Sequence, residues 1–230
     1  MKKSTFSLFI AVLFFNFSFG QNEEVDIKKG DYKILKLDAL NLMGLGVQKL
    51  HLSYEVSPMK QNENNLPMVN FNLTVPFNSL NEIEMNYGIE VGAELRFYQS
   101  WITDKELGAE GFYLGVGLDG GYVSFSKLDQ YYANFGGVNK ESLNDYSRVR
   151  TGIYFLTGAQ SKLGDKLYFD VSFGMGWSNV NVSEDDPETN QNYNKNTYID
   201  SPFYSLYREG KSQRFYLPVS FGLGYNFGNK

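Results

Sequence analysis

The stretch RFYLPVSFGLGYNF, residues 214–227, decides the fold of this chain. Its odd positions, from Phe215 to Phe227, are all apolar or aromatic, and its even positions are polar or small apart from Pro218. This strict alternation predicts a β-strand, because successive side chains of a strand point to opposite faces. The stretch is about twice as long as an ordinary strand of a soluble protein.

Seven earlier segments show the same alternation of apolar and polar residues. They are Tyr32–Leu42, Lys49–Val56, Met68–Val75, Tyr87–Tyr98, Phe112–Phe125, Tyr146–Gln160 and Leu167–Trp177. No amphipathic helix of useful length separates them, so the repeating unit is the strand itself. The sequence therefore predicts an all-β fold, an eight-stranded antiparallel up-and-down β-barrel.

The first twenty residues have the features of a signal peptide. Two lysines precede an apolar run that ends at Phe15, and small residues follow at Ser18 and Gly20, where a signal peptidase would cleave. A transmembrane anchor is the alternative, but an apolar run of about ten residues is short for a bilayer span. We therefore divide the chain into a signal peptide (1–20), a short polar leader (21–30) and the barrel (31–230).

Composition narrows the class of protein further. The chain has 230 residues, no cysteine and a formal net charge of −5, so it has neither a disulfide nor a lipid-modified N-terminal cysteine. No basic stripe suggests a nucleic acid partner. Past residue 20 no apolar run is long enough for a membrane helix, so a membrane protein with this sequence would span the bilayer with strands.

The apolar face of the strands is predicted to lie outside the barrel and the polar face inside. The interior of an eight-stranded barrel is only just wide enough for side chains to fill, and the apolar face carries too many large side chains for it. The polar face is rich in glycine, which weakens strands but leaves room in a narrow lumen for tyrosines such as Tyr113 and Tyr154. Both features favour a transmembrane barrel over a soluble, lipocalin-like one.

The lengths of the connections suggest an orientation. Residues 126–145 and 183–211 are long and polar, whereas Leu163–Lys166 contains a tight Gly-Asp turn. With the N-terminus on the periplasmic side, the two long connections face outward and the tight turn faces inward, as in outer-membrane barrels. The inner connections 57–67 and 99–111 fit this asymmetry less well, because neither is tight.

Several short motifs occur in an order that resembles a known family. Besides the terminal GLGYNF, they are Asn41-Leu42, Leu52-Ser53-Tyr54-Glu55, the ELRFY of Glu94–Tyr98 and the GFYLG of Gly111–Gly115. In this order the chain is similar to the small outer-membrane β-barrel proteins of Gram-negative bacteria, a family labelled as a domain of unknown function, with an OmpA/OmpX-like barrel architecture. The resemblance covers nearly the whole mature chain and implies an outer-membrane location.

The resemblance also implies partners. In such proteins a terminal strand that ends in an aromatic residue resembles the signal read by the outer-membrane assembly machinery. Tyr225 and Phe227 would carry that signal here, although three further residues follow Phe227. Outer-membrane lipids and lipopolysaccharide would surround the barrel, and we expect a monomer.

Charged residues of the polar face would meet inside the barrel. Buried charges need partners, so we expect a network of ion pairs and hydrogen bonds that plugs the lumen. A polar conduit or ligand site is the alternative, although eight strands leave no wide aqueous channel. The expected lumen network consists of Lys36, Asp38, His51, Glu55, Glu90, Glu94, Arg96, Asp119, Arg148, Arg150, Asp170 and Arg214.

No group of residues indicates catalysis or a bound cofactor. His51, the only histidine, lies on the lumen face with Ser53 and Glu55, but no Gly-x-Ser-x-Gly motif occurs. The acidic residues between Glu184 and Glu188 lack the spacing of a Ca²⁺ loop, so a solvated loop is favoured over a metal site. We therefore expect no enzyme, no cofactor and no metal.

Aromatic residues near the strand ends complete the sequence-based picture. On the apolar face they suit the interfacial girdle of a membrane barrel: Tyr54, Tyr87, Tyr122, Trp177, Tyr225 and Phe227. We expect a small non-enzymatic outer-membrane protein that supports envelope integrity or binds through its long outer loops. A narrow channel or small-ligand carrier is the alternative. A rim-located lipid- or peptide-modifying enzyme with His51 as base is a further one.

Overall fold

A computed structural model of the protein describes residues 32–43, 47–57, 67–79, 83–98, 109–133, 140–185, 193–196 and 206–228. The expected signal peptide (1–20) and leader (21–30) lie outside the described residues. Within the described part of the chain, no helix is both long enough and apolar enough to cross a bilayer.

Strands make up almost all of the described chain. The elements are β1 (Lys33–Asp38), α2 (Ala39–Met43), β2 (Val47–Val56), β3 (Met68–Ser79), β4 (Ile83–Tyr98), β5 (Gly111–Ala133), β6 (Lys140–Lys162), β7 (Leu167–Glu184), β8 (Tyr193–Asn196), β9 (Gly210–Tyr216) and β10 (Val219–Asn226).

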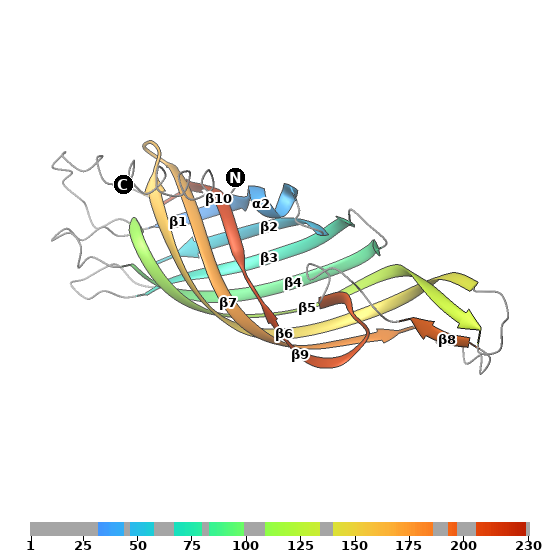
Figure 1. Ribbon diagram of the computed structural model, residues 1–230. Helices are drawn as coiled ribbons and strands as arrows, with labels where there is room; N and C mark the ends of the chain where they lie inside the picture. Colours follow the sequence, from blue (N-terminus) through green and yellow to red (C-terminus); the bar gives the residue numbers. More distant parts are fainter. Residues whose placement is uncertain are drawn as a thin grey trace, which may run out of the picture.

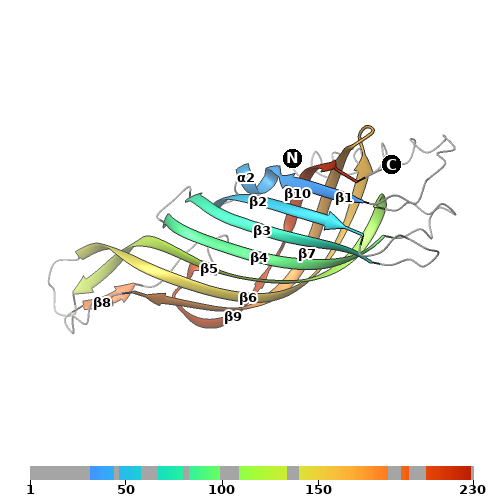
Figure 2. The ribbon, with the colours of Figure 1, turned by 180° about the vertical axis from the view of Figure 1, so that it is seen from behind.

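The sheet closes on itself as an antiparallel barrel of eight strands. Neighbouring strands pair in chain order from β1 to β7, β7 pairs with both β9 and β10, and β10 returns to pair with β1. Together β9 and β10 form the eighth strand, the stretch around residues 214–227. Figures 1 and 2 show the strands curving around a common interior. The predicted all-β, eight-stranded antiparallel barrel is confirmed.

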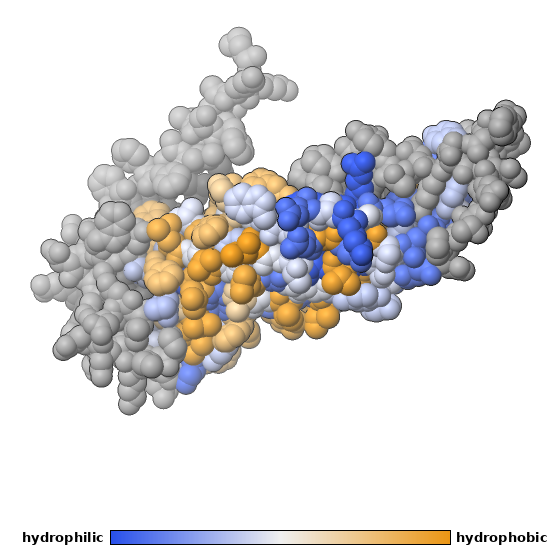
Figure 3. All heavy atoms as spheres, turned by 90° about the horizontal axis from the view of Figure 1, so that it is seen from below, coloured by the Kyte–Doolittle hydropathy of each residue, from blue (hydrophilic) through white to orange (hydrophobic). Residues whose placement is uncertain are grey.

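Side chains alternate between the inside and the outside of the barrel as the sequence predicted. Along β7 buried and exposed residues alternate from Leu167 to Val182, except that Phe169 and Asn181 are half-buried. The inward set is polar or small, whereas large apolar residues face outward and remain exposed. In Figure 3 the outward residues form a hydrophobic area over the barrel. This is the reverse of a water-soluble barrel, whose apolar side chains lie inside.

The first strand is shorter than predicted, because its chain turns into α2 after Asp38. The Asp38 side chain caps this short helix: its Oδ1 accepts a hydrogen bond from the Asn41 amide at 3.1 Å, the pattern of an N-cap residue. The prediction of a strand from Tyr32 to Leu42 is therefore wrong in its second half. The alternation of apolar and polar residues breaks at Leu40, and the local cap replaces strand pairing.

The short β1 leaves an interruption in the wall of the barrel, which we call the wall gap. β1 pairs with β2 only as far as Leu52 and with β10 only as far as Gly222. In the described residues, Val47–His51 pair only with β3, and β9 pairs only with β7. The wall gap therefore lies between the start of β2 and β9, beside α2.

Pro218 does not create a bulge, although it separates β9 from β10. Tyr216 lies opposite Gly176 and Val219 lies opposite Phe173, so the register is the same on both sides of the proline. The Gly174 amide donates to the Pro218 carbonyl at 2.8 Å. Only the return bond is missing, because proline has no amide hydrogen.

β5 and β6 continue beyond the barrel, and β8 joins them there; we call this part of the sheet the extension. β5 and β6 stay paired from the barrel out to Tyr131 opposite Lys140, and β8 adds to the outer edge of β5. In Figure 1 the extension projects away from the end of the barrel where β1 begins. The predicted loop 126–145 is therefore largely a strand hairpin, and the predicted loop 183–211 contains β8 and the start of β9.

Candidate functional site in the barrel lumen

The polar side chains inside the barrel form two clusters at different depths. The inner cluster, nearer the end of the barrel where β1 begins, contains Lys36, Glu55, Glu94, Arg96 and Asp170. The outer cluster, nearer the extension, contains Lys49, Glu90, Asp119, Arg148 and Arg150. Both clusters draw their members from several strands, so each forms only when the barrel closes.

The inner cluster centres on Asp170 of β7. Lys36 Nζ from β1 donates to both Asp170 and Glu55. Arg96 Nη1 from β4 lies 2.6 Å from the same oxygen of Asp170, and Arg96 Nε donates to Glu94 at 2.7 Å. Two bases therefore face three acids, and all five side chains are buried.

Tyrosine hydroxyls supply the donors that the three carboxylates still need. Tyr98 donates to Glu55 at 2.7 Å, Tyr113 to Asp170 at 2.6 Å and Tyr154 to Glu94 at 2.9 Å. Gln160 accepts a hydrogen bond from Lys36 and donates its own to the Ala109 carbonyl at 2.6 Å. Buried carboxylates are tolerated when they are paired and hydrogen-bonded in this way.

Glycines on neighbouring strands make room for these tyrosine rings. A Cβ atom at Gly117 would overlap the Tyr154 ring, and one at Gly158 would overlap the Tyr113 ring. A Cβ at Gly176 would lie 2.6 Å from the Tyr216 ring. The glycine-rich lumen face thus has the steric role that the sequence suggested.

The outer cluster centres on Glu90 of β4. Arg148 Nη2 donates to Glu90 at 2.7 Å, while Arg150 Nε and Lys49 Nζ lie 3.5 and 3.4 Å from its oxygens. Arg150 Nη2 also donates to Asp119 at 2.5 Å. In contrast to the inner cluster, three bases face two acids here, so the outer cluster carries an excess of positive charge.

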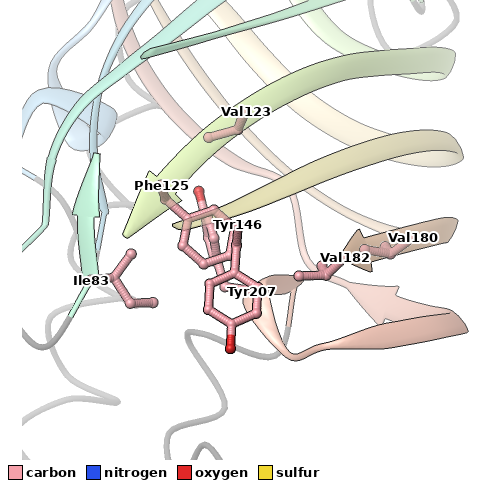
Figure 4. Close-up of a cluster of buried hydrophobic side chains, with 7 residues drawn as sticks. All are labelled: Ile83, Val123, Phe125, Tyr146, Val180, Val182 and Tyr207. Atoms are coloured by element: carbon pink, nitrogen blue, oxygen red, sulfur yellow. The ribbon is translucent and has the colours of Figure 1, made fainter. Parts of the chain in front are cut away.

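Apolar clusters lie at both ends of this polar interior. Towards the extension, Phe125 stacks on Tyr146 and meets the edge of Tyr207, with ring centroids 5.5 and 5.1 Å apart; Figure 4 shows this cluster. At the end of the barrel where β1 begins, Ile34 and Met68 pack with other buried residues. Apolar side chains thus lie on both sides of the charged clusters.

Three of the predicted lumen residues lie apart from the two clusters. Asp38 caps α2, as described above. The His51 ring Nδ1 lies 2.7 Å from the Thr74 hydroxyl, whereas Glu55 belongs to the inner cluster. Arg214 bonds to the Ser212 hydroxyl and to the Arg208 carbonyl, both at 2.6 Å.

Sequence reasoning placed the charges on the right face but missed several of their partners. Gln160, Lys49 and the tyrosines were not included in the expected network. The alternation puts Gln160 and Lys49 on the lumen face, and the glycine on a neighbouring strand marks where a tyrosine ring can lie. The actual contacts depend on strand register: Lys36 and Asp170 are 134 positions apart.

The two aromatic side chains of the expected assembly signal lie on the outer face of the barrel. Tyr225 and Phe227 are exposed, and their ring centroids are 4.8 Å apart. The Phe227 amide donates to the Lys33 carbonyl at 2.9 Å, which ties the end of the chain to the start of β1. Recognition by an assembly machinery stays a prediction.

One acidic residue outside the strands has an environment that shifts its titration. Glu110 immediately precedes β5, and partial burial raises the pKa of its carboxyl above the ordinary value. The Lys162 amide donates to Glu110 Oε1 at 3.0 Å and opposes that rise, as does the charge of Lys162.

The described residues bring together no obvious reaction centre. Among them, no three His, Cys, Asp or Glu side chains gather as a metal site would require. No family model matches the chain, and neither a curated protein nor a solved structure matches it.

Proposed function

We propose that this protein is a small, non-enzymatic outer-membrane barrel whose lumen is plugged and whose extension acts at the cell surface. The observation that carries the proposal is the inverted distribution of side chains: an exposed apolar outer face surrounds a polar, filled interior. Water would disfavour so large an apolar surface, because soluble monomers rarely expose more than a few hundred Å² of contiguous apolar area. Lipid would favour it.

The outer face suits a bilayer in its detail. Leu118 is 62% exposed, Val91 55% and Phe155 53%, each inside its strand. Aromatic residues also pair at a strand end, where the ring centroids of Tyr225 and Phe227 are 4.8 Å apart. Transmembrane barrels place aromatic residues at the two interfaces in this way. Outer-membrane lipids and lipopolysaccharide would then be its surroundings.

The filled lumen argues against an open pore. The carboxylates of both clusters are paired with bases, most of these charged side chains are buried, and apolar side chains lie at both ends. An ion that entered would have to break these buried pairs, and eight strands leave little room besides. The part available for contact with partners is the extension, which together with the barrel would support envelope integrity or surface binding.

Cell fractionation and gel migration test the proposal. The protein should fractionate with the outer membrane and should migrate differently before and after heating in detergent, as a folded barrel does. Recovery as a soluble periplasmic protein would contradict it. A deletion strain complemented with either the full chain or a chain without the extension then separates the roles: rescue of envelope integrity by the shortened chain would assign that role to the barrel.

A small-ligand carrier or narrow channel is the second candidate, favoured by the wall gap. In the outer cluster the side chains of Lys49 and Asp119 are 21% and 14% exposed, whereas Arg148 is fully buried. Planar-bilayer recording should show no discrete conductance for the plugged barrel. A discrete conductance that changes in the Glu90→Gln variant would favour the channel instead.

A further inference from the structure

The outer lumen contains buried hydrogen-bond donors that have no partner in the described chain. Arg148 is completely buried, yet its Nε and Nη1 make no hydrogen bond there, and only Nη2 is used, on Glu90. Arg214 Nη1 and the Tyr207 hydroxyl are also buried without a partner among the described residues. Leaving such groups unsatisfied is costly, and a guanidinium is more costly than a neutral donor.

These donors belong to one region of the lumen. The Arg148 guanidinium lies over the Tyr207 ring, 4.2 Å from its centroid. Arg214, on β9, donates from Nη2 to the carbonyl of Arg208, the residue after Tyr207, at 2.6 Å. β6 and β9 pair with opposite edges of the outer part of β7, so their lumen-facing side chains converge from either side of one strand.

Among the described residues, the charges of this region are not balanced. Lys49, Arg148, Arg150 and Arg214 contribute four positive charges, and Glu90 and Asp119 contribute two negative ones. The inner cluster has the opposite imbalance, so the surplus belongs to the outer lumen and not to the whole barrel. A surplus of two positive charges beside unpartnered donors is the environment that a doubly charged anion needs.

We propose that the outer lumen binds a phosphate group, held by Arg148, Arg214 and the Tyr207 hydroxyl. A phosphate dianion matches the surplus charge, whereas a carboxylate would neutralise only half of it. Its several acceptor oxygens also match guanidinium donors on two strands, because guanidinium groups bind phosphate through paired N–H bonds. The group could belong to inorganic phosphate or to a lipid phosphomonoester.

The wall gap favours access to this region from the side of the barrel. Arg214 lies on β9, whose second edge is not paired within the described residues. A lipid headgroup at the outer interface would approach Arg214 along that edge. This lipid source rests on the proposed membrane location, whereas binding of inorganic phosphate does not.

Calorimetric titration of the folded protein in phosphate-free detergent tests the proposal. Inorganic phosphate, at constant ionic strength set with chloride, should bind with a stoichiometry of one. The Arg214→Gln variant should weaken binding by about tenfold or more, since it removes a charged hydrogen bond. Among the described residues, its side chain hydrogen-bonds only to Ser212 and Arg208, so the barrel should still fold.

The Lys211→Gln variant is the matched control. It removes the same charge from the same strand, but Lys211 is exposed and points outward, so phosphate affinity should not change. The Arg148→Lys and Tyr207→Phe variants should each weaken binding, with folding checked by heat-dependent gel migration. If Arg148→Lys does not fold, Arg214→Gln and Tyr207→Phe still decide the result.

A second titration identifies the source of the phosphate group. Native mass spectrometry should compare phosphatidic acid with diacylglycerol, which has the same chains and no phosphate. Binding of phosphatidic acid that Arg214→Gln abolishes assigns the site to a lipid headgroup; binding of inorganic phosphate alone assigns it to the free ion. The proposal is wrong if neither form binds, or if Lys211→Gln weakens binding as much as Arg214→Gln.

Discussion

Arg96 shows how the interior of this barrel depends on single residues. It lies against Asp170, Glu94 and Glu55, and all of these groups are buried. Removing one partner of a buried ion pair leaves uncompensated charge, which costs more than the pair itself contributes. Each buried charge of the lumen therefore needs its partners in place, so the barrel tolerates these charges only as a complete set.

Replacing Arg96 with Met should destabilise the folded barrel by about 3–5 kcal/mol, because three carboxylates would then share Lys36 alone. The free energy of unfolding, measured by urea titration in detergent, checks this value. Tyr98→Phe, which removes one hydrogen bond to Glu55, should cost only about 1 kcal/mol. The exposed Lys211→Met change should stay within about 0.5 kcal/mol; equal losses for Arg96→Met and Lys211→Met would contradict the argument.

Gly117→Ala should destabilise the barrel by about 1–3 kcal/mol, since the added methyl group overlaps the Tyr154 ring and forces it to move. In the double variant with Tyr154→Ala, most of that penalty should disappear, and a double-mutant cycle of unfolding free energies measures the coupling. Gly222→Ala is the control on the same face, because its Cβ would meet no atom closer than 3.5 Å. Additive losses for the first pair would refute the steric role.

Glu110→Gln should change how stability depends on pH. Burial raises the pKa of Glu110 in the folded state above that in the unfolded chain, so the folded state binds the proton more tightly. The resulting stabilisation is complete below the unfolded pKa and is lost as the pH rises through the folded pKa. The unfolding free energy of the wild type minus that of the variant should therefore fall as the pH rises from the ordinary value of 4.5. A difference in unfolding free energy that does not change with pH would contradict the raised pKa of Glu110.

At this scale the sequence predicts which face a side chain occupies but not what it touches. The alternation placed Lys36 and Arg96 inside correctly, because the period of a strand is two. It could not pair Arg96 with Asp170, since that contact depends on how far each strand is shifted against its neighbours. The unpartnered Arg148 nitrogens were equally out of reach, because they emerge only when every contact is known.

At the scale of elements, the eight barrel strands were predictable and their ends were not. Each strand has one apolar face, which the sequence displays directly. The extension escaped prediction because residues 126–145 have few large apolar side chains on either face and look like a loop. Backbone pairing between β5 and β6 holds them as strands. At the end of β1, α2 replaces the rest of the predicted strand, because the Asp38 side chain caps the helix.

Asp38→Ala should weaken α2 by about 1 kcal/mol, because the Asn41 amide loses the side-chain acceptor of its N-cap. Hydrogen exchange at the Asn41 amide should become faster, while exchange in the middle of β6 should not change. Asp38→Asn keeps an acceptor at the same position and should behave nearly like the wild type. Unchanged exchange at Asn41 in Asp38→Ala would contradict the capping role.

For the whole molecule, the barrel and the extension are separable in principle. β4 pairs with β5 no farther out than Lys127, opposite Ile83, so strand pairing beyond that point involves only the extension. Barrel stability should then depend little on the outer part of the hairpin. Predicting this division from the sequence was not feasible, because both parts use one continuous pair of strands.

Replacing residues 129–142 by Asn-Gly should leave a folded barrel. Leu128 and Leu143 lie directly opposite each other, and Asn-Gly suits a two-residue turn between paired strands. The loss of Asp129 removes its hydrogen bond from Tyr146 and its 2.8 Å ion pair with Lys127, so stability should fall without loss of the barrel fold. Heat-dependent gel migration and circular dichroism check folding. Failure of this shortened chain to fold, with the full chain folding beside it, would show that the extension is required.

The five-position pairing of β1 with β10 has a consequence for the lifetime of the ring. The hydrogen bond from the Lys33 amide to Asn226 joins residues 193 positions apart, whereas the other barrel neighbours are joined by successive hairpins. Closing so long a loop costs entropy before any contact forms, and few contacts form at this junction. The eight strands would therefore assemble as an open sheet whose two edges meet last. The same junction would separate first when the protein unfolds.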